Sequence, residues 1–355
     1  MKKYRIGIIG CGGIMQYSHL PAILSLSEDL ELVAVSDMED ERMYKEGIPK
    51  DVKRYHDYMD LINDPEIDII DICTPNYLHS SISVAGLNAG KHVMCEKPEA
   101  TTAKEMEEII SAEKASGKRF MAIRNCRKYD VSEFLSNYVK AGKCGELYSG
   151  KCGYVRRRGI PGKGGWFTNS LKSGGGPLVD LGVHMLDFAI FIMGNPKALS
   201  VSCCTYSKFA DTDLSDSDNS KFGDKVENGV YNVEDMAIGF IRFEDGRSLQ
   251  FEFCWAANLE KETSYVQLYG TKSGFSCSFH DENKNVIYTE ESGELVNIKP
   301  NSVVFKSGHG KCFKNLIEVL NDKAEPDYTT EQGLNVVKIL EAAYTSAREG
   351  REVMI

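Results

Sequence analysis

The sequence predicts an α/β protein of two domains: an N-terminal, doubly wound parallel sheet of the Rossmann type, then an α+β domain with a large, mostly antiparallel open sheet. Three observations support this. Short apolar runs alternate with helical segments in the first third of the 355 residues, longer alternating runs dominate the remainder, and a glycine-rich turn follows the first run. We place the predicted domains at residues 1–124 and 125–355.

The first third contains five short apolar runs of the length and bounding residues typical of buried strands. They are residues 4–10, 30–37, 67–74, 91–95 and 119–123. Helices are predicted at 18–26, 79–89 and 102–116. Helical segments between short buried strands predict a parallel sheet with right-handed crossovers. Ligands of such sheets bind at the carboxyl ends of the strands.

The second part begins with a long alternating run at 145–158, which would place Tyr154, Arg156 and Arg158 on one face of a strand. A helix at 178–193 is opened by Gly-Gly-Gly-Pro and closed by Gly194. Further elements are predicted as strands at 198–206, 235–243, 248–255 and 265–269, a hairpin turn at 244–247, a polar loop at 211–228 and a closing helix at 331–348.

Composition limits the classes of function. The net charge of −10 disfavours nucleic acid as a partner, and no apolar run approaches the roughly 18 residues of a membrane span. Glycines interrupt the apolar start of the chain, which argues against a signal peptide. The eleven cysteines are scattered, as buried thiols are in a reducing compartment, so we expect a cytoplasmic protein that does not bind a membrane.

The turn after the first strand is predicted to bind a dinucleotide. Gly10 permits the tight turn, Gly12 lets the backbone approach a pyrophosphate, and Gly13 and Ile14 are further candidates for binding the cofactor. Asp37 ends the second strand, where a carboxylate accepts from ribose hydroxyls and repels a 2′-phosphate, so NAD is favoured over NADP. The alternatives are a glycine turn without a ligand and an aspartate that only caps a helix.

Lys97 lies in Glu96-Lys97-Pro98, directly after the fourth predicted strand. An ammonium at the carboxyl end of a strand can hydrogen-bond a substrate oxygen and stabilise negative charge on it. The alternative is a surface lysine that precedes a helix.

Asp180 and His184 are four residues apart on the predicted helix 178–193 and therefore share one face. An imidazole beside a carboxylate suits a proton acceptor at neutral pH. His184 could instead only pack or cap. The spacing could also suit a metal, but only Asp187 is close by, so we predict no metal site.

Several motifs together resemble one family: that of glucose–fructose oxidoreductase, inositol dehydrogenase and the rhizopine-catabolism proteins (Gfo/Idh/MocA). The resemblance extends over essentially the whole chain. Its motifs are GIIGCGGI at the start, HLPA at 19–22, CTPN at 73–76 with His79, AGKHVMCEKP at 89–98 and GGGPLVDLGVHMLD at 174–187. The chain departs from the usual fingerprint at Met15, which replaces the third glycine.

The resemblance implies a role for each matching residue. Lys97 would be the catalytic lysine, Asp180 would orient the substrate, and His184 would be the acid/base. Asn125 would lie near the nicotinamide, Trp166 would reach the cofactor, and His309 is a looser match to a cofactor contact. Five further residues would line the cofactor: Thr74, Pro75, Asn76, His79 and Glu96.

Together these features predict NAD-dependent hydride transfer at a hydroxyl or carbonyl carbon of a sugar, inositol or related polyol. The candidate substrate contacts are Lys97, Asp180, His184, Arg127, Tyr154, Arg156, Arg158, Trp166 and Trp255. One alternative is an NAD-dependent glycoside-cleaving enzyme that oxidises the sugar transiently, and another is a non-catalytic dinucleotide-binding protein. We expect a homodimer or homotetramer formed through the open face of the second sheet.

Overall fold

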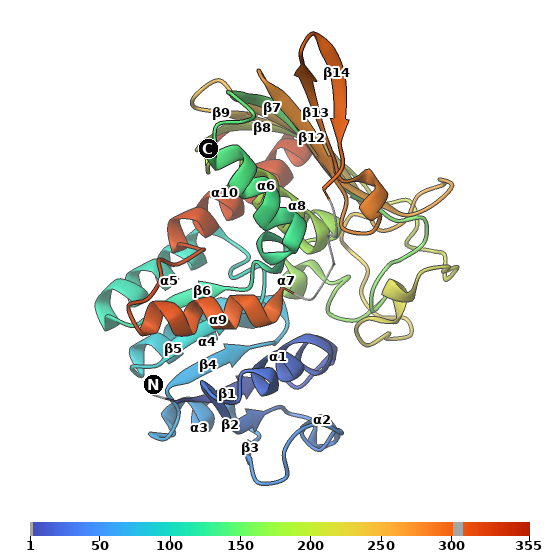
Figure 1. Ribbon diagram of the computed structural model, residues 1–355. Helices are drawn as coiled ribbons and strands as arrows, with labels where there is room; N and C mark the ends of the chain where they lie inside the picture. The colour runs from blue at the N-terminus through green and yellow to red at the C-terminus, as the bar shows by residue number, and fades with distance from the viewer. Residues whose placement is uncertain (1–2, 301–307) are drawn as a thin grey trace. The chain divides into compact units, whose positions relative to one another are not determined.

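The structure is a computed structural model that describes residues 3–300 and 308–355. The chain forms two compact units, and Figure 1 colours it from the N- to the C-terminus. The first unit comprises Met1–Asn125 with Ser307–Val337, and the second comprises Cys126–Lys306 with Lys338–Ile355. The units differ from the two ranges predicted from sequence in one respect, because Ser307–Val337 lies with the first unit.

The first unit contains a six-stranded sheet in the order β3-β2-β1-β4-β5-β6, and every adjacent pair is parallel. This confirms the predicted doubly wound sheet. Its strands are β1 Tyr4–Ile9, β2 Leu30–Ser36, β3 Lys53–Tyr55, β4 Ile69–Ile72, β5 His92–Cys95 and β6 Phe120–Ala122. The sequence prediction missed β3, a three-residue edge strand with no apolar run to reveal it.

Helices pack on both faces of this sheet, where they bury two apolar clusters. Bounds in chain order are η1 Met15–His19, α1 Leu20–Ser25, α2 Asp40–Met43, α3 Tyr58–Asn63, η2 Asn76–Leu78, α4 His79–Asn88, α5 Ala103–Ser116 and α9 His309–Leu320. A capping box between Thr102 and Glu105 begins α5. Phe313 and Leu316 of α9 share a core with Ile6 and Ile23, which explains why this late segment belongs to the first unit.

The second unit contains a nine-stranded sheet in the order β14-β13-β12-β11-β7-β10-β9-β8-β15. Its strands are β7 Leu147–Val155, β8 Ala198–Tyr206, β9 Met236–Phe243, β10 Ser248–Cys254, β11 Thr263–Gly270, β12 Ser273–Cys277, β13 Val286–Glu291, β14 Glu294–Ile298 and β15 Val353–Met354. The pair β7–β10 is parallel and the other pairs are antiparallel, which confirms the predicted mostly antiparallel sheet. The hairpin turn at Gly246 is also confirmed.

The helical elements of the second unit are α6 Asp130–Lys140, α7 Ser170–Ser173, η4 Leu178–Gly182, α8 Val183–Ile192, η5 Asp218–Lys221 and η6 Glu282–Lys284. Two more, η3 Asn125–Lys128 and α10 Thr330–Glu349, have residues in both units. Within the described residues one stretch, Ser170–Ile192, is long and apolar enough for a membrane span, but 83% of that window is buried, as expected of a core helix.

The predicted strand at 145–158 is too long. β7 ends at Val155, so Arg156 and Arg158 follow the strand and do not continue its alternation. The chain turns there because the Gly159 N–H donates to the carbonyl of Trp255, and Arg158 retains only an isolated bridge to Ala256. Their side chains are consequently placed by individual contacts and not by a shared strand face.

The cysteines follow the sequence prediction of buried thiols. Ten are buried, Cys204 is exposed, and the described residues contain no disulfide.

Candidate functional site

The glycine turn after β1 has open space where the prediction needs it. Gly10 has φ +93°, and a Cβ there would lie 2.8 Å from the Cys73 carbonyl carbon, so this position requires glycine. A Cβ on Gly12 would meet nothing within 4 Å. Gly12, Gly13 and Ile14 are partly exposed, whereas Met15 is fully buried in the core. Met15 therefore fits where the fingerprint usually has glycine, and the turn leaves room for a pyrophosphate.

Asp37 lies at the end of β2 and is fixed to this turn. Its Oδ2 accepts from the Cys11 N–H at 2.8 Å, and its Oδ1 accepts from the Glu39 N–H at 3.0 Å. Burial and the charge of Asp37 raise the pKa of Cys11 to about 12, while Arg42, Arg54 and Lys45 lower it. Of these cations, Arg54 is distant from Asp37 in sequence and is brought near it only by folding.

The loop after β4 contains the predicted cofactor residues Thr74, Pro75, Asn76 and His79. The Thr74 Oγ1 is buried and has no hydrogen-bond partner within the described residues. A buried hydroxyl without a partner is costly, and a bound group with polar atoms would satisfy it. With the open Gly12 and the carboxylate of Asp37, this fits a dinucleotide at the carboxyl edge of the sheet.

His79 instead connects two loops of the protein. Its Nδ1 lies 2.7 Å from the Pro98 carbonyl and its Nε2 lies 2.7 Å from the Thr74 carbonyl. Burial lowers the pKa of His79, which is 1% exposed. Its ring therefore holds the β4 and β5 loops together and leaves almost no surface for a cofactor.

Glu96 is also engaged by protein partners. Its Oε2 accepts the Lys97 N–H at 3.0 Å, and its Oε1 lies 2.8 Å from His19 Nε2 and 3.3 Å from His309 Nε2. Burial alone would raise the pKa of Glu96, but the hydrogen bonds from the two histidines hold it well below its usual range. Glu96 thereby fixes the backbone at Lys97, whose side chain is half-buried.

His19 has carboxylates on both sides. Its Nδ1 lies 2.9 Å from Asp71 and its Nε2 faces Glu96, so both nitrogens donate only if the ring is protonated. Burial lowers the pKa of His19, but the Asp71 charge raises it well above its usual value. His19, Glu96 and His309 could also hold a metal ion by proximity. A protonated His19 ring and ordinary hydrogen-bond distances explain the cluster, and the absence of a metal stays a prediction.

The helix with Asp180 and His184 begins as a π-helix, η4, and continues as α8. Turns of π-helix are rare in proteins, and those that occur are often found at functional sites. From Leu178 to Met193 every residue is buried except Asp180, His184 and Phe191, which are partly exposed. The polar pair therefore lies on the accessible side of a core helix whose other charged residue, Asp187, is buried. His184 Nδ1 is also 3.8 Å from Cys126 Sγ.

Trp255 was predicted from the sequence to contact a substrate, but its side chain is not accessible to one. Its side chain is 0% exposed, and its Nε1 donates to Asp180 Oδ2 at 3.0 Å. The proposal failed because alternation along β10 shows which face a residue occupies and not whether that face is covered. Trp255 instead orients the carboxylate of Asp180.

Arg127 is likewise occupied. Its guanidinium donates to both carboxylate oxygens of Asp187, at 2.8 and 2.6 Å, and each side chain is 2% exposed. It also lies over the Phe191 ring, 4.6 Å from its centroid. This geometry supports a structural role for Arg127 in holding α8 against the preceding segment, in place of the predicted substrate contact.

Tyr154 and Arg156 belong to a polar cluster that sequence reasoning did not find. The Tyr154 hydroxyl donates to Glu262 at 2.8 Å and lies 3.1 Å from His280 Nε2. Arg156 stacks over the Tyr154 ring, and its Nε is buried without a hydrogen-bond partner within the described residues. Glu262 and His280 had no motif to mark them, because only folding brings them beside β7.

The remaining predicted residues differ in their surroundings. Arg158 is bound to the carbonyls of Arg157 and Ala257 and to Asn258, which favours a structural role. Trp166 is partly exposed and stacks on Phe167, with 3.8 Å between ring centroids. Asn125 is partly exposed at the start of η3, and His309 is bound to Glu96 as described above.

These features define a class of protein. A parallel sheet with a dinucleotide-type glycine turn, followed by a helix that exposes an aspartate–histidine pair, is the arrangement of a dinucleotide-dependent oxidoreductase. Comparison with known proteins identifies the family. Residues 4–123 match the model for the Gfo/Idh/MocA oxidoreductase family, NAD-binding Rossmann fold, and residues 137–355 match its C-terminal alpha/beta domain. The chain belongs to this family.

Individual relatives cover nearly the whole chain. It is 30% identical over 358 residues to a D-glucoside 3-dehydrogenase of Escherichia coli K12, covering 98% of this chain and 97% of the relative. It is 24% identical over 368 residues to a scyllo-inositol 2-dehydrogenase (NADP(+)) of Bacillus subtilis 168, covering 99% and 96%. Levoglucosan dehydrogenase in complex with NADH has the same fold, with a TM-score of 0.85 and 20% identity over 100% of this chain and 99% of the other.

Proposed function

We propose that this protein is an NAD-dependent dehydrogenase of a sugar, inositol or related polyol, and that it transfers a hydride at a CH–OH carbon. The observation that carries the proposal is the partly exposed pair Asp180 and His184 on a helix whose other residues are almost all buried. A polar pair kept accessible on a core helix, with a second polar site at the carboxyl edge of a Rossmann sheet, supports catalysis over structural packing.

Each residue has a proposed task. His184 takes the proton of the substrate hydroxyl, and Asp180, held by the Trp255 N–H, orients the substrate. Lys97 hydrogen-bonds the reacting oxygen and stabilises its negative charge, with its backbone fixed by Glu96. The nicotinamide accepts or returns the hydride when bound. Gly12, Asp37 and Thr74 would hold the dinucleotide, together with Gly10, Gly13, Ile14, Pro75, Asn76, Asn125 and Trp166.

We propose NAD as the preferred dinucleotide because Asp37 would repel a 2′-phosphate. The relatives include an enzyme named for NADP(+) and a structure with NADH, so the preference rests on Asp37 and its neighbours. Arg42, Arg54 and Lys45 act against it, although the Arg54 guanidinium donates to four backbone carbonyls, those of Met43, Pro49, Lys50 and Val52.

The substrate class follows from the names of relatives, which include a D-glucoside dehydrogenase and several inositol dehydrogenases. A panel of alkyl glucosides, free hexoses and inositols, each incubated with NAD or NADP, tests it by absorbance of the reduced nicotinamide. We expect at least one cyclic polyol or glucoside to support turnover with NAD. Absence of turnover across the whole panel with both dinucleotides would contradict the proposal.

A glycoside-cleaving enzyme that oxidises its substrate transiently is the second candidate. The relative that acts on a D-glucoside favours keeping it, because oxidation of a glucoside ring carbon is the first step of such cleavage. Release of free sugar without net formation of reduced nicotinamide would support this candidate over a simple dehydrogenase.

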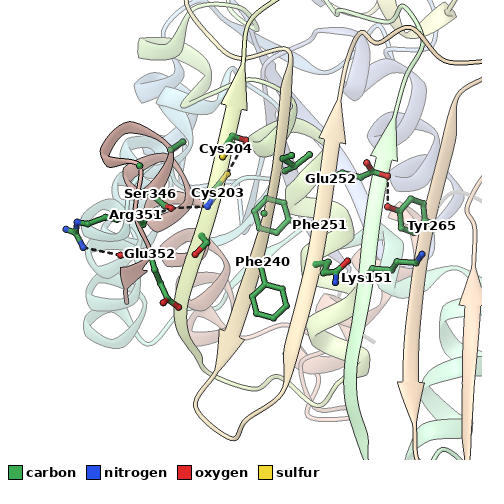
Figure 2. Close-up of a pocket in the computed structure, with 16 residues that line it drawn as sticks. Lys151, Cys203, Cys204, Phe240, Phe251, Glu252, Tyr265, Ser346, Arg351 and Glu352 are labelled. Carbon is green, nitrogen blue, oxygen red and sulfur yellow. Dashed lines mark hydrogen bonds between the residues drawn. The ribbon is translucent and has the colours of Figure 1, made fainter.

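We further propose a homodimer or homotetramer that forms through the outer face of the nine-stranded sheet. Figure 2 shows side chains on this face. They line an open pocket of about 890 Å³. Ile238 and Phe240 are partly exposed there, but Lys151, Gln250 and Glu252 lie among them, so the face is more polar than the sequence prediction assumed. A monomer at micromolar concentration in light scattering would refute the proposal.

We also propose a cytoplasmic location and a small-molecule substrate, with no nucleic-acid or membrane partner. The net charge of −10 and the ten buried cysteines without a disulfide support this.

A further inference from the structure

The start of the helix that carries Asp180 and His184 is held by a buried acid from a distant segment. Glu234 is 7% exposed, and its Oε2 accepts the Gly176 N–H at 3.0 Å while its Oε1 accepts the Leu178 N–H at 3.1 Å. The Leu178 N–H lies in the first turn of the helix and the Gly176 N–H directly precedes that turn, so neither has an intrahelical acceptor. A carboxylate at this end also interacts favourably with the helix dipole.

The same contact explains the glycines that open the helix. A Cβ on Gly176 would lie 2.9 Å from the Glu234 carboxyl carbon. A Cβ on Gly175 would collide with the Tyr344 hydroxyl and lie 2.9 Å from Val179 Cγ2. Tyr344 in turn donates to Glu234 Oε1 at 2.8 Å. The Gly-Gly-Gly-Pro motif is therefore shaped to admit a carboxylate and a phenol against the start of the helix.

We propose that Glu234 is a positioning residue for the Asp180–His184 pair: it fixes the first turn of their helix and thereby the orientation of both side chains. The effect of Glu234 on catalysis rests on the proposed function. The anchoring of the helix by Glu234 can be tested without a substrate, because the anchoring contacts are all within the second unit.

The surroundings of Glu234 make this anchor sensitive to pH. Burial raises the pKa of Glu234 to about 7, although hydrogen bonds from Tyr344 and the Leu178 N–H oppose the shift. The charge of Glu234 also acts on Cys203 of β8 and on Tyr231, whereas the neighbouring Asp235 accepts from the Lys208 and Phe209 N–H groups. Burial also raises the pKa of Tyr344, so its hydroxyl remains a donor. The Glu234 carboxylate already accepts from three donors, the Gly176 and Leu178 N–H groups and the Tyr344 hydroxyl. Protonation of Glu234 would add a fourth donor and weaken these hydrogen bonds to the start of the helix.

Trp255 gives a direct optical readout of this region. It is one of two tryptophans in the chain, and its Nε1 is bonded to Asp180. In a Trp166→Phe chain, its fluorescence reports the first turn of the helix without any substrate. We expect the emission to change with an inflection near pH 7, to keep that inflection in His184→Gln and to lose it in Glu234→Gln. An inflection that is missing, that persists in Glu234→Gln or that disappears in His184→Gln would overturn the proposal.

Kinetics supply the second arm, with Tyr344→Phe as the matched control that removes one bond to Glu234 but leaves both backbone N–H bonds. We expect Glu234→Gln to lower kcat by about 10-fold to 100-fold, the range for a lost hydrogen bond to a charged group, with NAD affinity unchanged. Tyr344→Phe should stay within a few-fold of wild type. Equal kcat in the two variants would overturn the proposal, whereas a wild-type chain without turnover would contradict only the proposed function.

Glu234→Asp keeps the experiment decisive if the glutamine variant fails to fold. Aspartate retains the charge but is one methylene too short to reach both N–H groups. We expect a folded protein whose kcat is lowered while its circular dichroism matches wild type. A kcat equal to wild type would show that the distance from Glu234 to the helix start is unimportant, and would overturn the proposal.

Discussion

The two units carry their functional residues in different ways. In the first unit, the candidate cofactor residues lie in short motifs at the ends of neighbouring strands, and the bond from Cys11 to Asp37 spans only 26 residues. In the second unit, the pair Asp180 and His184 depends on partners from distant segments, as Glu96 of the first unit depends on His309, 213 residues away. Glu234 is 58 residues from Gly176, and Trp255 is 75 residues from Asp180. A motif identifies such a site, but distant residues orient it.

The largest effect is expected from a substitution of Lys97 in the first unit, which should lower turnover without lowering NAD affinity. Lys97→Ala should lower turnover by orders of magnitude and leave NAD affinity nearly unchanged, because Lys97 is proposed to act on charge that develops at the substrate oxygen. Steady-state kinetics and a fluorescence titration with NAD check this. Lys118→Ala is a suitable control, since Lys118 lies between α5 and the start of β6, whereas Lys97 follows the end of β5. If Lys97→Ala abolishes NAD binding, the lysine is a cofactor ligand.

The corresponding change in the second unit is His184→Ala. A positioned acid–base group contributes typically about 10²–10⁴-fold, so kcat should fall within that range while NAD affinity is retained. His56→Ala, which removes an exposed histidine of the first unit, provides the control. Near-wild-type turnover of His184→Ala on the true substrate would refute its role as proton acceptor.

Arg127→Ala tests whether Arg127 is structural. Removing one partner of a buried ion pair leaves an uncompensated charge and costs about 3–5 kcal/mol, so the free energy of unfolding in urea should fall by about that amount. Because Arg127 is bound to Asp187, the folded fraction should keep its KM. A raised KM with unchanged stability would restore the original prediction of a substrate contact.

The smallest expected effect concerns the choice of cofactor. Asp37→Ser should narrow the preference for NAD over NADP by about tenfold, since a repulsion of roughly 1.4 kcal/mol corresponds to that factor. Dissociation constants of both dinucleotides measure it, with Glu39→Ser as a control at an exposed neighbour. Tighter binding of NADP than NAD by the wild-type chain would show that Arg42, Arg54 and Lys45 outweigh Asp37.

Local sequence patterns predicted some features of the fold and the site, whereas features that depend on distant contacts could not be predicted. Both sheets and the Asp180–His184 helix could be predicted, because apolar periodicity and glycine turns are local signals. The short strands β3, β12, β13, β14 and β15 were not predicted from the sequence. The burial of Trp255, the pairing of Arg127 with Asp187 and the role of Glu234 could not be predicted, because each depends on a contact that exists only after folding.

Direct hydride transfer is the central claim, and isotope transfer tests it most directly. The protein is incubated with NAD and ring-deuterated inositol or glucoside, and the reduced dinucleotide is examined by mass spectrometry. We predict that each reduced nicotinamide carries one deuterium from the substrate carbon and that His184→Ala forms the same product more slowly. Oxidised sugar that forms while the reduced dinucleotide contains no deuterium would contradict the account.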